Sequence, residues 1–199
     1  MIETPQPQGV DGLHLLRPIV LIGLMGAGKT SVGKRLAALL GVPFTDSDSR
    51  IVEAAGMSVP EIFASLGEPA FRDGERRVIA RLLAERPGVI ATGGGAFVEA
   101  RTRAEIAKRG VSVWLRADLE TLWERVRDRP GRPLLQTADP KGTLADLHRR
   151  RMPIYALADV AVDSRRGISH DTMARSFVAA VRGWDESRPG EAPSFGDRP

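Results

Sequence analysis

One stretch decides how this chain folds: Ile19-Val-Leu-Ile-Gly23-Leu-Met-Gly-Ala-Gly28-Lys29-Thr30-Ser31. Its first four residues are aliphatic and predict a buried strand, and a helical pattern opens at its end. Between them lies G-x-x-x-x-G-K-[ST], whose glycines let backbone N–H groups wrap closely around phosphate oxygens. A glycine-rich turn that holds Lys-Thr by chance is the alternative, which the flanking strand and helix disfavour. The stretch therefore predicts a strand, a phosphate-binding loop and a helix.

The polar residues of this loop have separate tasks. The ammonium of Lys29 is expected to reach the β- and γ-phosphates, and the hydroxyl of Thr30 is expected to ligate Mg²⁺. The helix after the loop turns its positive N-terminal end toward the same anion. The expected nucleotide-binding residues of the loop are Gly26, Ala27, Gly28, Lys29, Thr30 and Ser31.

The length and composition indicate one globular domain. The chain has 199 residues, of which 42% are hydrophobic and 27% charged, as is ordinary for such a domain. We expect a loose extension over residues 1–17, the domain over residues 18–184 and a disordered tail over residues 185–199. The chain has no cysteine, no long apolar run and no secretory signal, so we expect a cytoplasmic protein with no membrane partner. We also expect a monomer.

The net charge of +4 is concentrated in one segment. Residues 125–151 hold eight Lys or Arg and three Asp, a net charge of +5, so the rest of the chain is near −1. Aromatic residues make up only 5% of the chain, and no platform for base stacking is visible, which disfavours nucleic acid as a partner. A basic segment of this kind is instead expected to close over a polyphosphate.

Strands and helices alternate along the chain. Short apolar runs predict strands at residues 19–22, 42–45, 89–92, 111–115 and 160–163. Helical spacing predicts helices at residues 31–40, 50–55, from 67 onward, 119–126, 144–157 and 170–184. Ser58, with Glu61 three residues later, forms a capping box and predicts a further helix that begins there. A strand, a helix and a strand in succession form a βαβ unit. The predicted fold class is therefore α/β with a parallel sheet, whose ligands bind where the strands end.

Two carboxylates follow the strand at residues 42–45. Asp46 and Asp48 lie where that strand ends, so both could reach the phosphate loop at the end of the first strand. Asp48 or Ser49 could instead be the N-cap of the helix at residues 50–55. A cap and a catalytic role are compatible with each other.

Two further groups of residues could contact a ligand. Arg72 and Glu75 are three apart on a helix and therefore neighbours. They could form a solvated ion pair, or Glu75 could hold Arg72 at a fixed angle toward a substrate carboxylate. Gly93, Gly94 and Gly95 end a parallel strand, where they could form a tight turn or let a ligand approach the backbone.

A segment at residues 128–143 has the features of a lid. Prolines lie on both sides of Arg132, and the apolar residues nearby have no helical partner face. These features predict a mobile lid rather than a part of the core.

Together these parts indicate phosphoryl transfer from a nucleoside triphosphate. A GTPase switch would read guanine with Asn-Lys-x-Asp, and this chain contains no asparagine. A motor or AAA-type ATPase would have an apolar strand that ends in Asp, whereas the strand at residues 89–92 is followed by three glycines. A small-molecule or nucleotide kinase remains, and a binding module without turnover is the non-enzymatic alternative.

Six groups of residues occur in a characteristic order and spacing: residues 23–31, Asp46-Ser47-Asp48, Phe71-Arg72 with Glu75, Gly93-Gly94-Gly95, Arg132-Pro133-Leu134-Leu135 and Arg151-Met152-Pro153-Ile154-Tyr155. They resemble the shikimate kinases over roughly residues 17–183. The resemblance implies a three-layer P-loop NTPase fold, like that of the nucleoside monophosphate kinases, with a five-stranded parallel sheet in order 2-3-1-4-5 and a lid. It also implies ATP-dependent phosphorylation of the shikimate 3-hydroxyl, a step of aromatic amino-acid biosynthesis, with Mg²⁺ as cofactor.

The resemblance implies roles for residues at the phosphates. Lys29 and Arg132 would hold the phosphates and take part in catalysis, with Asp48 as the base that also binds the shikimate hydroxyl. Thr30 and Asp46 would place Mg²⁺, the latter through water.

It also implies roles at the two ends of the site. Arg72 and Arg151 would grip the shikimate carboxylate beside the backbone of Gly93, Gly94 and Gly95. Arg125 would stack on adenine, and Arg166 would belong to the adenine pocket. The alternative is a related kinase that acts on gluconate or another cyclitol or hydroxy acid.

Overall fold

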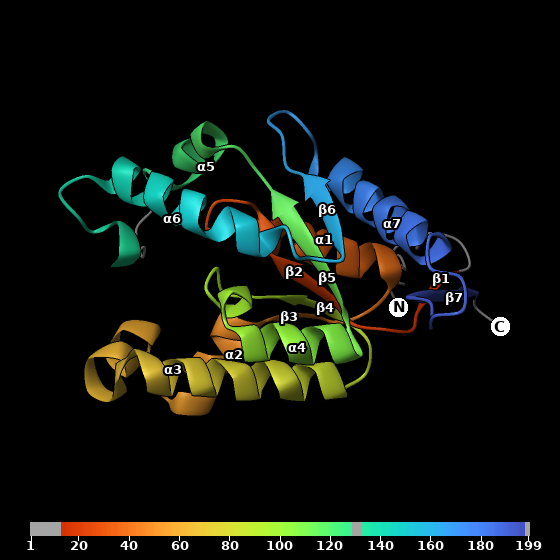
Figure 1. Cartoon of the computed structure of the whole chain (residues 1–199), viewed down its shortest axis with the longest axis horizontal. Coiled ribbons are helices and arrows are strands. Elements are labelled where there is room, and N and C mark those ends of the chain that lie inside the picture. The colour runs from red at the N-terminus through yellow and green to blue at the C-terminus, as the bar shows by residue number, and fades with distance from the viewer. Residues whose placement is uncertain (1–12, 129–132, 198–199) are drawn as a thin grey trace, which may run out of the picture.

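The centre of the molecule is a five-stranded parallel sheet in order β3-β4-β2-β5-β6 (Figure 1). The computed structural model describes residues 13–128 and 133–197. The strands of this sheet are β2 (Ile19–Ile22), β3 (Phe44–Asp46), β4 (Val89–Ala91), β5 (Val111–Arg116) and β6 (Val160–Asp163). In chain order this is 2-3-1-4-5, so the predicted topology is confirmed.

Helices cover the sheet and carry most of its connections. They are α1 (Lys29–Leu40), α2 (Ser47–Ala55), α3 (Val59–Ala84), α4 (Ala100–Arg109), α5 (Leu119–Val126), α6 (Pro140–Tyr155) and α7 (His170–Glu186). Short 3₁₀ turns lie at Ala96–Val98 and Pro133–Leu135. Helix α1 packs against α7, and α3 packs against α4. No helix in the described part of the chain is long and apolar enough to cross a membrane.

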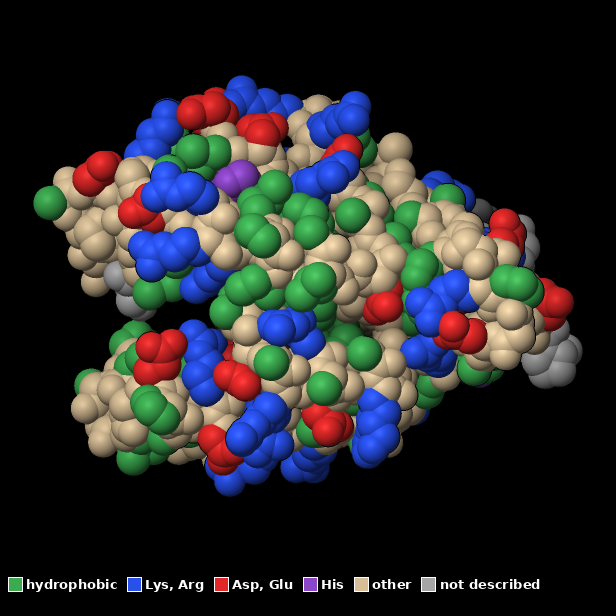
Figure 2. Space-filling view, in the orientation of Figure 1, with side chains coloured by type: hydrophobic (Ala, Val, Ile, Leu, Met, Phe, Trp, Pro, Cys, Tyr) green, Lys and Arg blue, Asp and Glu red, His purple; other side chains and the backbone are tan. Residues whose placement is uncertain are grey.

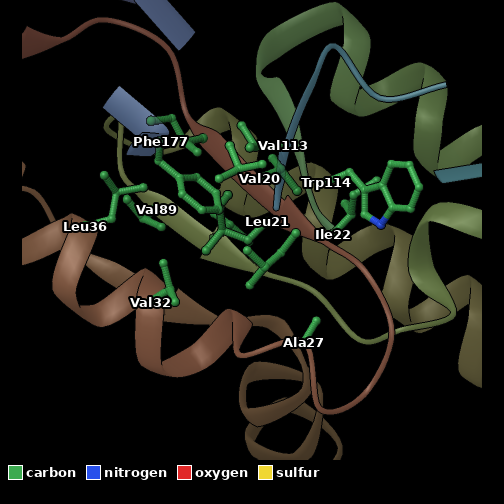
Figure 3. Packing of buried hydrophobic residues seen from close by; sticks show 14 of the residues in the cluster. Val20, Leu21, Ile22, Ala27, Val32, Leu36, Val89, Val113, Trp114 and Phe177 are labelled. Carbon is green, nitrogen blue, oxygen red and sulfur yellow. The ribbon is translucent and has the colours of Figure 1, made fainter. Parts of the chain in front are cut away.

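The core is built around β2, the strand that leads into the phosphate loop. All four of its residues are fully buried, and successive side chains of a strand point to opposite faces of the sheet. Both faces are therefore covered, as expected for a parallel sheet. Val32 and Leu36 of α1 and Phe177 of α7 lie in the same cluster as β2 (Figure 3).

The start of α2 differs from the prediction. This helix begins at Ser47 rather than at residue 50, and its N-cap is Asp46. The Asp46 carboxylate accepts hydrogen bonds from the backbone N–H groups of Asp48 at 3.1 Å and Ser49 at 3.5 Å. The alternative in which Asp48 or Ser49 caps the helix is therefore wrong. The cap leaves Asp48 in the first turn of α2, at the edge where the strands end.

Helix α3 joins two predicted helices, and its N-cap Ser58 with the capping box to Glu61 confirms the predicted start of the first. It runs from Val59 to Ala84, and Gly67 within it has non-helical angles of φ 79° and ψ 168°. Because few residues other than glycine adopt a positive φ, Gly67 supplies the kink. The part after the kink carries Arg72 and Glu75 toward the end of β4.

Helix α4 was not predicted from the sequence. Its ten residues bury only Thr102 and Ile106, and its N-cap is Glu99 rather than a Ser, Thr, Asn or Asp. A helix with one large apolar residue has almost no periodic hydrophobic signal. Its place in the fold is set by packing against α3.

The two ends of the chain are more ordered than the sequence suggests. A second, two-stranded antiparallel sheet joins β1 (Leu13–Leu15) to β7 (Phe195–Asp197). Leu15 is 1% exposed and Phe195 8%, and Leu16 N–H donates to the Ser194 carbonyl at 2.8 Å. The expected loose extension and disordered tail are therefore wrong for residues 13–17 and 185–197. The rest of those two predictions lies outside the described residues.

Candidate active site

The phosphate loop joins β2 directly to α1. Gly23, Gly26 and Gly28 have φ angles of 137°, 82° and 102°, a region that side chains other than glycine avoid. A Cβ atom at Gly26 would also lie 2.7 Å from a methyl carbon of Val126. Gly28 is the N-cap of α1 and no side chain caps the helix, so the positive end of the helix dipole is directed at the loop.

Lys29 lies over the loop that it follows. Its ammonium donates to the carbonyl oxygens of Gly23 at 2.8 Å and Leu24 at 3.0 Å. These contacts bend the side chain back over the loop, where phosphate oxygens would be held by the α1 N-terminus. The structure thus brings the Lys29 ammonium to the phosphate loop.

Thr30 and Asp46 come together as predicted. The Thr30 hydroxyl donates to Oδ2 of Asp46 at 3.1 Å. A hydroxyl and a carboxylate side by side suit Mg²⁺, which takes one or two protein oxygens and completes its shell with phosphates and water. Among the described residues no group of three or more His, Cys, Asp or Glu could hold a metal, so a site made only of side chains finds no support there.

A cavity of about 310 Å³ opens beside the loop. It is lined by residues 25–32 and by Arg125, Ser164, Arg165, Ile168, His170 and Met173. Arg125 Nη1 donates to Ser164 Oγ at 2.8 Å and to the Gly26 and Ala27 carbonyls at 3.3 Å. Burial lowers the pKa of Arg125. The structure therefore brings Arg125 and the loop together.

Arg166 is not among the residues that line this cavity. Its guanidinium pairs with Glu124 of α5, and Arg165 lines the cavity in its place. Ser164 is a residue that the sequence analysis missed. It is 4% exposed, and its hydroxyl donates to the Ala27 carbonyl at 3.0 Å. Its place directly after a parallel strand was the available signal.

A second, larger cavity of about 710 Å³ lies between α3 and α6. Arg72, Asp73 and Arg76 of α3 line one side, and Arg151 of α6 lies on the other. Gly95 and Val98 form part of the wall. Figure 2 shows this cleft where the upper and lower parts of the molecule separate, with charged side chains along its lower lip.

The three consecutive glycines each face one side chain of the predicted site. A Cβ atom at Gly93 would lie 2.6 Å from Asp48 Oδ1, one at Gly94 would lie 3.3 Å from Arg151 Nη1, and one at Gly95 would lie 2.6 Å from Arg72 Nη1. None of the three has a positive φ, so turn geometry does not require glycine there. A side chain at these positions would instead press against Asp48, Arg151 or Arg72.

Arg72 is held by two glutamates. Its Nη1 donates to Glu75 at 2.7 Å and its Nη2 to Glu68 at 3.1 Å. The Glu75 side chain is only 2% exposed, so the solvated ion pair is the wrong alternative. Burial raises the pKa of Glu75, against the opposing effect of Arg72. Burial would lower the pKa of Arg72, but the two glutamates outweigh it and the net shift is upward.

Arg151 is anchored to the glycine turn. Its Nη1 donates to the Gly94 carbonyl at 3.0 Å, and the Tyr155 hydroxyl donates to the same oxygen. Asp48, Arg72 and Arg151 thus surround the turn, whereas Arg132 lies outside the described residues.

These features define a class of protein. A phosphate loop on a 2-3-1-4-5 parallel sheet, with a second cavity beside it, is the architecture of a P-loop kinase for small molecules. The family model for shikimate kinase matches residues 25–182. The chain belongs to the shikimate kinase family.

Curated relatives and solved structures agree with this family. The chain is 60% identical to a shikimate kinase of Caulobacter vibrioides over 86% of each chain. It is 53% identical to one of Ruegeria pomeroyi over 90% of this chain and 93% of the relative. The structure of shikimate kinase from Acinetobacter baumannii in complex with shikimate is 38% identical, with a TM-score of 0.78 over 82% of this chain and 91% of that one. A gluconokinase from Sinorhizobium meliloti is 21% identical, with a TM-score of 0.58 over 92% of this chain and 97% of that one, and shares the fold alone.

Proposed function

We propose that this protein transfers the γ-phosphoryl group of ATP to the 3-hydroxyl of shikimate, which gives shikimate 3-phosphate and ADP. The observation that carries the proposal is the placement of Arg72 and Arg151 on either side of the glycine turn, next to Asp48. Two guanidinium groups suit a carboxylate. A carboxylate beside them suits a substrate hydroxyl.

At the donor end, the chain holds the triphosphate and stabilises the charge that develops on it. The N-terminal amides of α1 and the Lys29 ammonium bind phosphate oxygens. Arg125 lines the same cavity, and its flat guanidinium would stack on the adenine base. We propose that Arg132 adds a further cation at the transferred group, on the strength of the sequence resemblance alone.

The metal in this proposal is Mg²⁺, held by Thr30 and by Asp46 through water. When bound, Mg²⁺ neutralises charge on the β- and γ-phosphates. Asp46 also caps α2, so the same carboxylate orients the first turn that carries Asp48.

At the acceptor end, Asp48 accepts the proton of the shikimate 3-hydroxyl. The oxygen of that hydroxyl bonds to the γ-phosphorus as the bond to ADP breaks and ADP leaves. Arg72 and Arg151 hold the carboxylate of the ring by charge-assisted hydrogen bonds. Gly94 lies against the phosphate loop, because a Cβ atom there would be 3.5 Å from Gly23 O and 3.7 Å from Met25 N. The acceptor turn and the donor loop are therefore in contact, which favours direct transfer.

A coupled assay of ADP release tests the proposal. The rate of the wild-type enzyme is measured with shikimate, quinate, gluconate or AMP as the acceptor, each with and without added Mg²⁺. We expect shikimate to give a kcat/KM at least about 100-fold above that of gluconate and AMP. Equal or higher kcat/KM with gluconate or AMP would overturn the assignment. We further propose that the enzyme is a cytoplasmic monomer. Sedimentation in an analytical ultracentrifuge at working concentration measures the oligomeric state.

A further inference from the structure

Tyr155 is a buried polar residue that takes no part in the proposed reaction as described above. It is the last residue of α6 and the only tyrosine of the chain. Its side chain is 1% exposed and lies against Trp114, with ring centroids 6.0 Å apart. A buried phenol hydroxyl needs a hydrogen-bond partner. That partner is the Gly94 carbonyl in the substrate turn.

The Gly94 carbonyl is held from two directions. It accepts from the Tyr155 hydroxyl and, at 3.0 Å, from Nη1 of Arg151. The two donors are four residues apart on α6 and so lie on the same face of the helix. A carbonyl oxygen has two lone pairs, and both are engaged here. Burial raises the pKa of Tyr155, with Arg151 opposing the rise, so the hydroxyl keeps its proton and remains a donor.

Fixing this carbonyl also fixes the N–H group of the next residue. The Gly94–Gly95 peptide is planar and trans, so its N–H points opposite to its C=O. With the carbonyl turned toward Tyr155 and Arg151, the Gly95 N–H points away from them. Within the described residues, neither the Gly94 nor the Gly95 N–H donates to a protein acceptor. Glycine has no side chain to restrict its peptide, so the hydrogen bonds must do so.

We propose that Tyr155 is a positioning residue for the acidic substrate: its hydroxyl locks the Gly94–Gly95 peptide and the Arg151 guanidinium in the orientation that receives the carboxylate. This inference rests on the proposed function of the same site. Tyr155 itself touches no reacting atom. It acts through the two groups that share the Gly94 carbonyl with it.

The test is Tyr155→Phe, which keeps the ring, its volume and its contact with Trp114 and removes only the hydroxyl. We expect KM for shikimate to rise about 3- to 12-fold, the factor that corresponds to one buried hydrogen bond. Both kcat and KM for ATP should stay within about 2-fold of wild type, because the phosphate loop is untouched. The preference for shikimate over its carboxamide should fall together with the affinity.

Ser112→Ala is the matched control. It removes another buried hydroxyl, which donates to Asp159 at 2.6 Å at the start of β5 and lines neither cavity. It should lower the melting temperature and leave both KM values unchanged. If Tyr155→Phe behaves in the same way, or weakens the acid and the carboxamide equally, Tyr155 is structural and the inference is overturned.

The wild-type enzyme separates this inference from the proposed function. If it prefers another carboxylate, such as quinate, the function fails, and the same KM ratio is measured with that acid and still decides the role of Tyr155. A wild-type enzyme that phosphorylates no carboxylate substrate overturns both.

Discussion

At the scale of single residues, the site is shaped as much by missing side chains as by present ones. Asp48, Arg151 and Arg72 occupy the space that a Cβ atom would need at Gly93, Gly94 and Gly95, in that order. Glycine normally weakens a structure by its conformational freedom. Here glycine leaves room for the side chains of Asp48, Arg151 and Arg72, which we propose bind the substrate.

Substitution of these glycines should therefore separate kcat from KM. In Gly93→Ala the methyl group would displace Asp48, and we expect kcat to fall at least about 10-fold with a smaller change in KM. In Gly95→Ala it would displace Arg72, and we expect KM for shikimate to rise about 10-fold with KM for ATP unchanged. Steady-state kinetics on both variants measure this.

Gly74→Ala is the control, because nothing lies within 4 Å of a Cβ atom there and the residue is inside α3. It should leave the kinetics unchanged and raise the free energy of unfolding by about 0.5–1 kcal/mol. If Gly93→Ala and Gly95→Ala also keep wild-type kinetics, steric contact with the side chains is not what selects glycine.

The buried carboxyl of Glu75 should make stability depend on pH in a definite direction. Its pKa in the folded protein is raised above the ordinary value of 4.5. The folded state therefore binds the proton more tightly than the unfolded state does. This contribution to stability is fully present below pH 4.5 and is lost as the pH rises through the raised pKa.

Glu75→Gln removes the titrating group and keeps the volume and an acceptor for Arg72. Urea unfolding from pH 4 to pH 8 should show wild type losing stability relative to this variant as the pH rises, by about 1.4 kcal/mol for each unit of pKa shift. A difference that is flat, or that has the opposite slope, would contradict the burial argument.

At the scale of elements, strongly periodic segments could be predicted and short or weakly patterned ones could not. The β2 strand and the helix His170–Glu186 have clear apolar patterns, and both lie within two residues of the predicted bounds. Helix α4 buries a single large apolar residue, and the three-residue strands β1 and β7 are too short to show alternation. These elements form because of partners distant in sequence.

The same limit applies to the site. The phosphate loop could be predicted because its residues are contiguous and each has a fixed task. The role of Glu75 could not be decided from the sequence, because its burial depends on the elements that pack against α3. Ser164 and Tyr155 donate to backbone carbonyls of distant loops, and which carbonyl each reaches depends on the tertiary fold.

The pairing of β1 with β7 should matter for stability and not for catalysis. Phe195 is 8% exposed, and neither strand lines either cavity. We expect Phe195→Ala to lower the free energy of unfolding by about 2–4 kcal/mol and to leave kcat and both KM values unchanged. Thermal melting and steady-state assays of one preparation test this. Leu157→Ala, at a 65% exposed residue, is the control and should change stability little. A loss of activity in Phe195→Ala would contradict the prediction and show that the small sheet supports the site.

At the scale of the whole molecule, the parallel sheet brings both halves of the reaction to one edge. Asp46 and Leu21 both lie opposite Ala91 in the strand register. The segments that follow these three residues, which carry Asp48, the phosphate loop and the glycine turn, therefore start at one level. Helices α3 and α6 then bring Arg72 and Arg151 to the same edge from outside the sheet. One architecture thus brings the phosphate loop and the two arginines that we propose bind an acid to the same edge.

The central claim is that two arginines bind a substrate carboxylate beside the phosphate loop, and kinetics with shikimate and its carboxamide test it most directly. Charge-assisted hydrogen bonds are worth about 1.5–3 kcal/mol each. We therefore expect wild type to prefer the acid by at least about 100-fold in kcat/KM, and Arg72→Lys to lose most of that preference because an ammonium lacks the planar fork. Equal use of the acid and the carboxamide by wild type would contradict the claim.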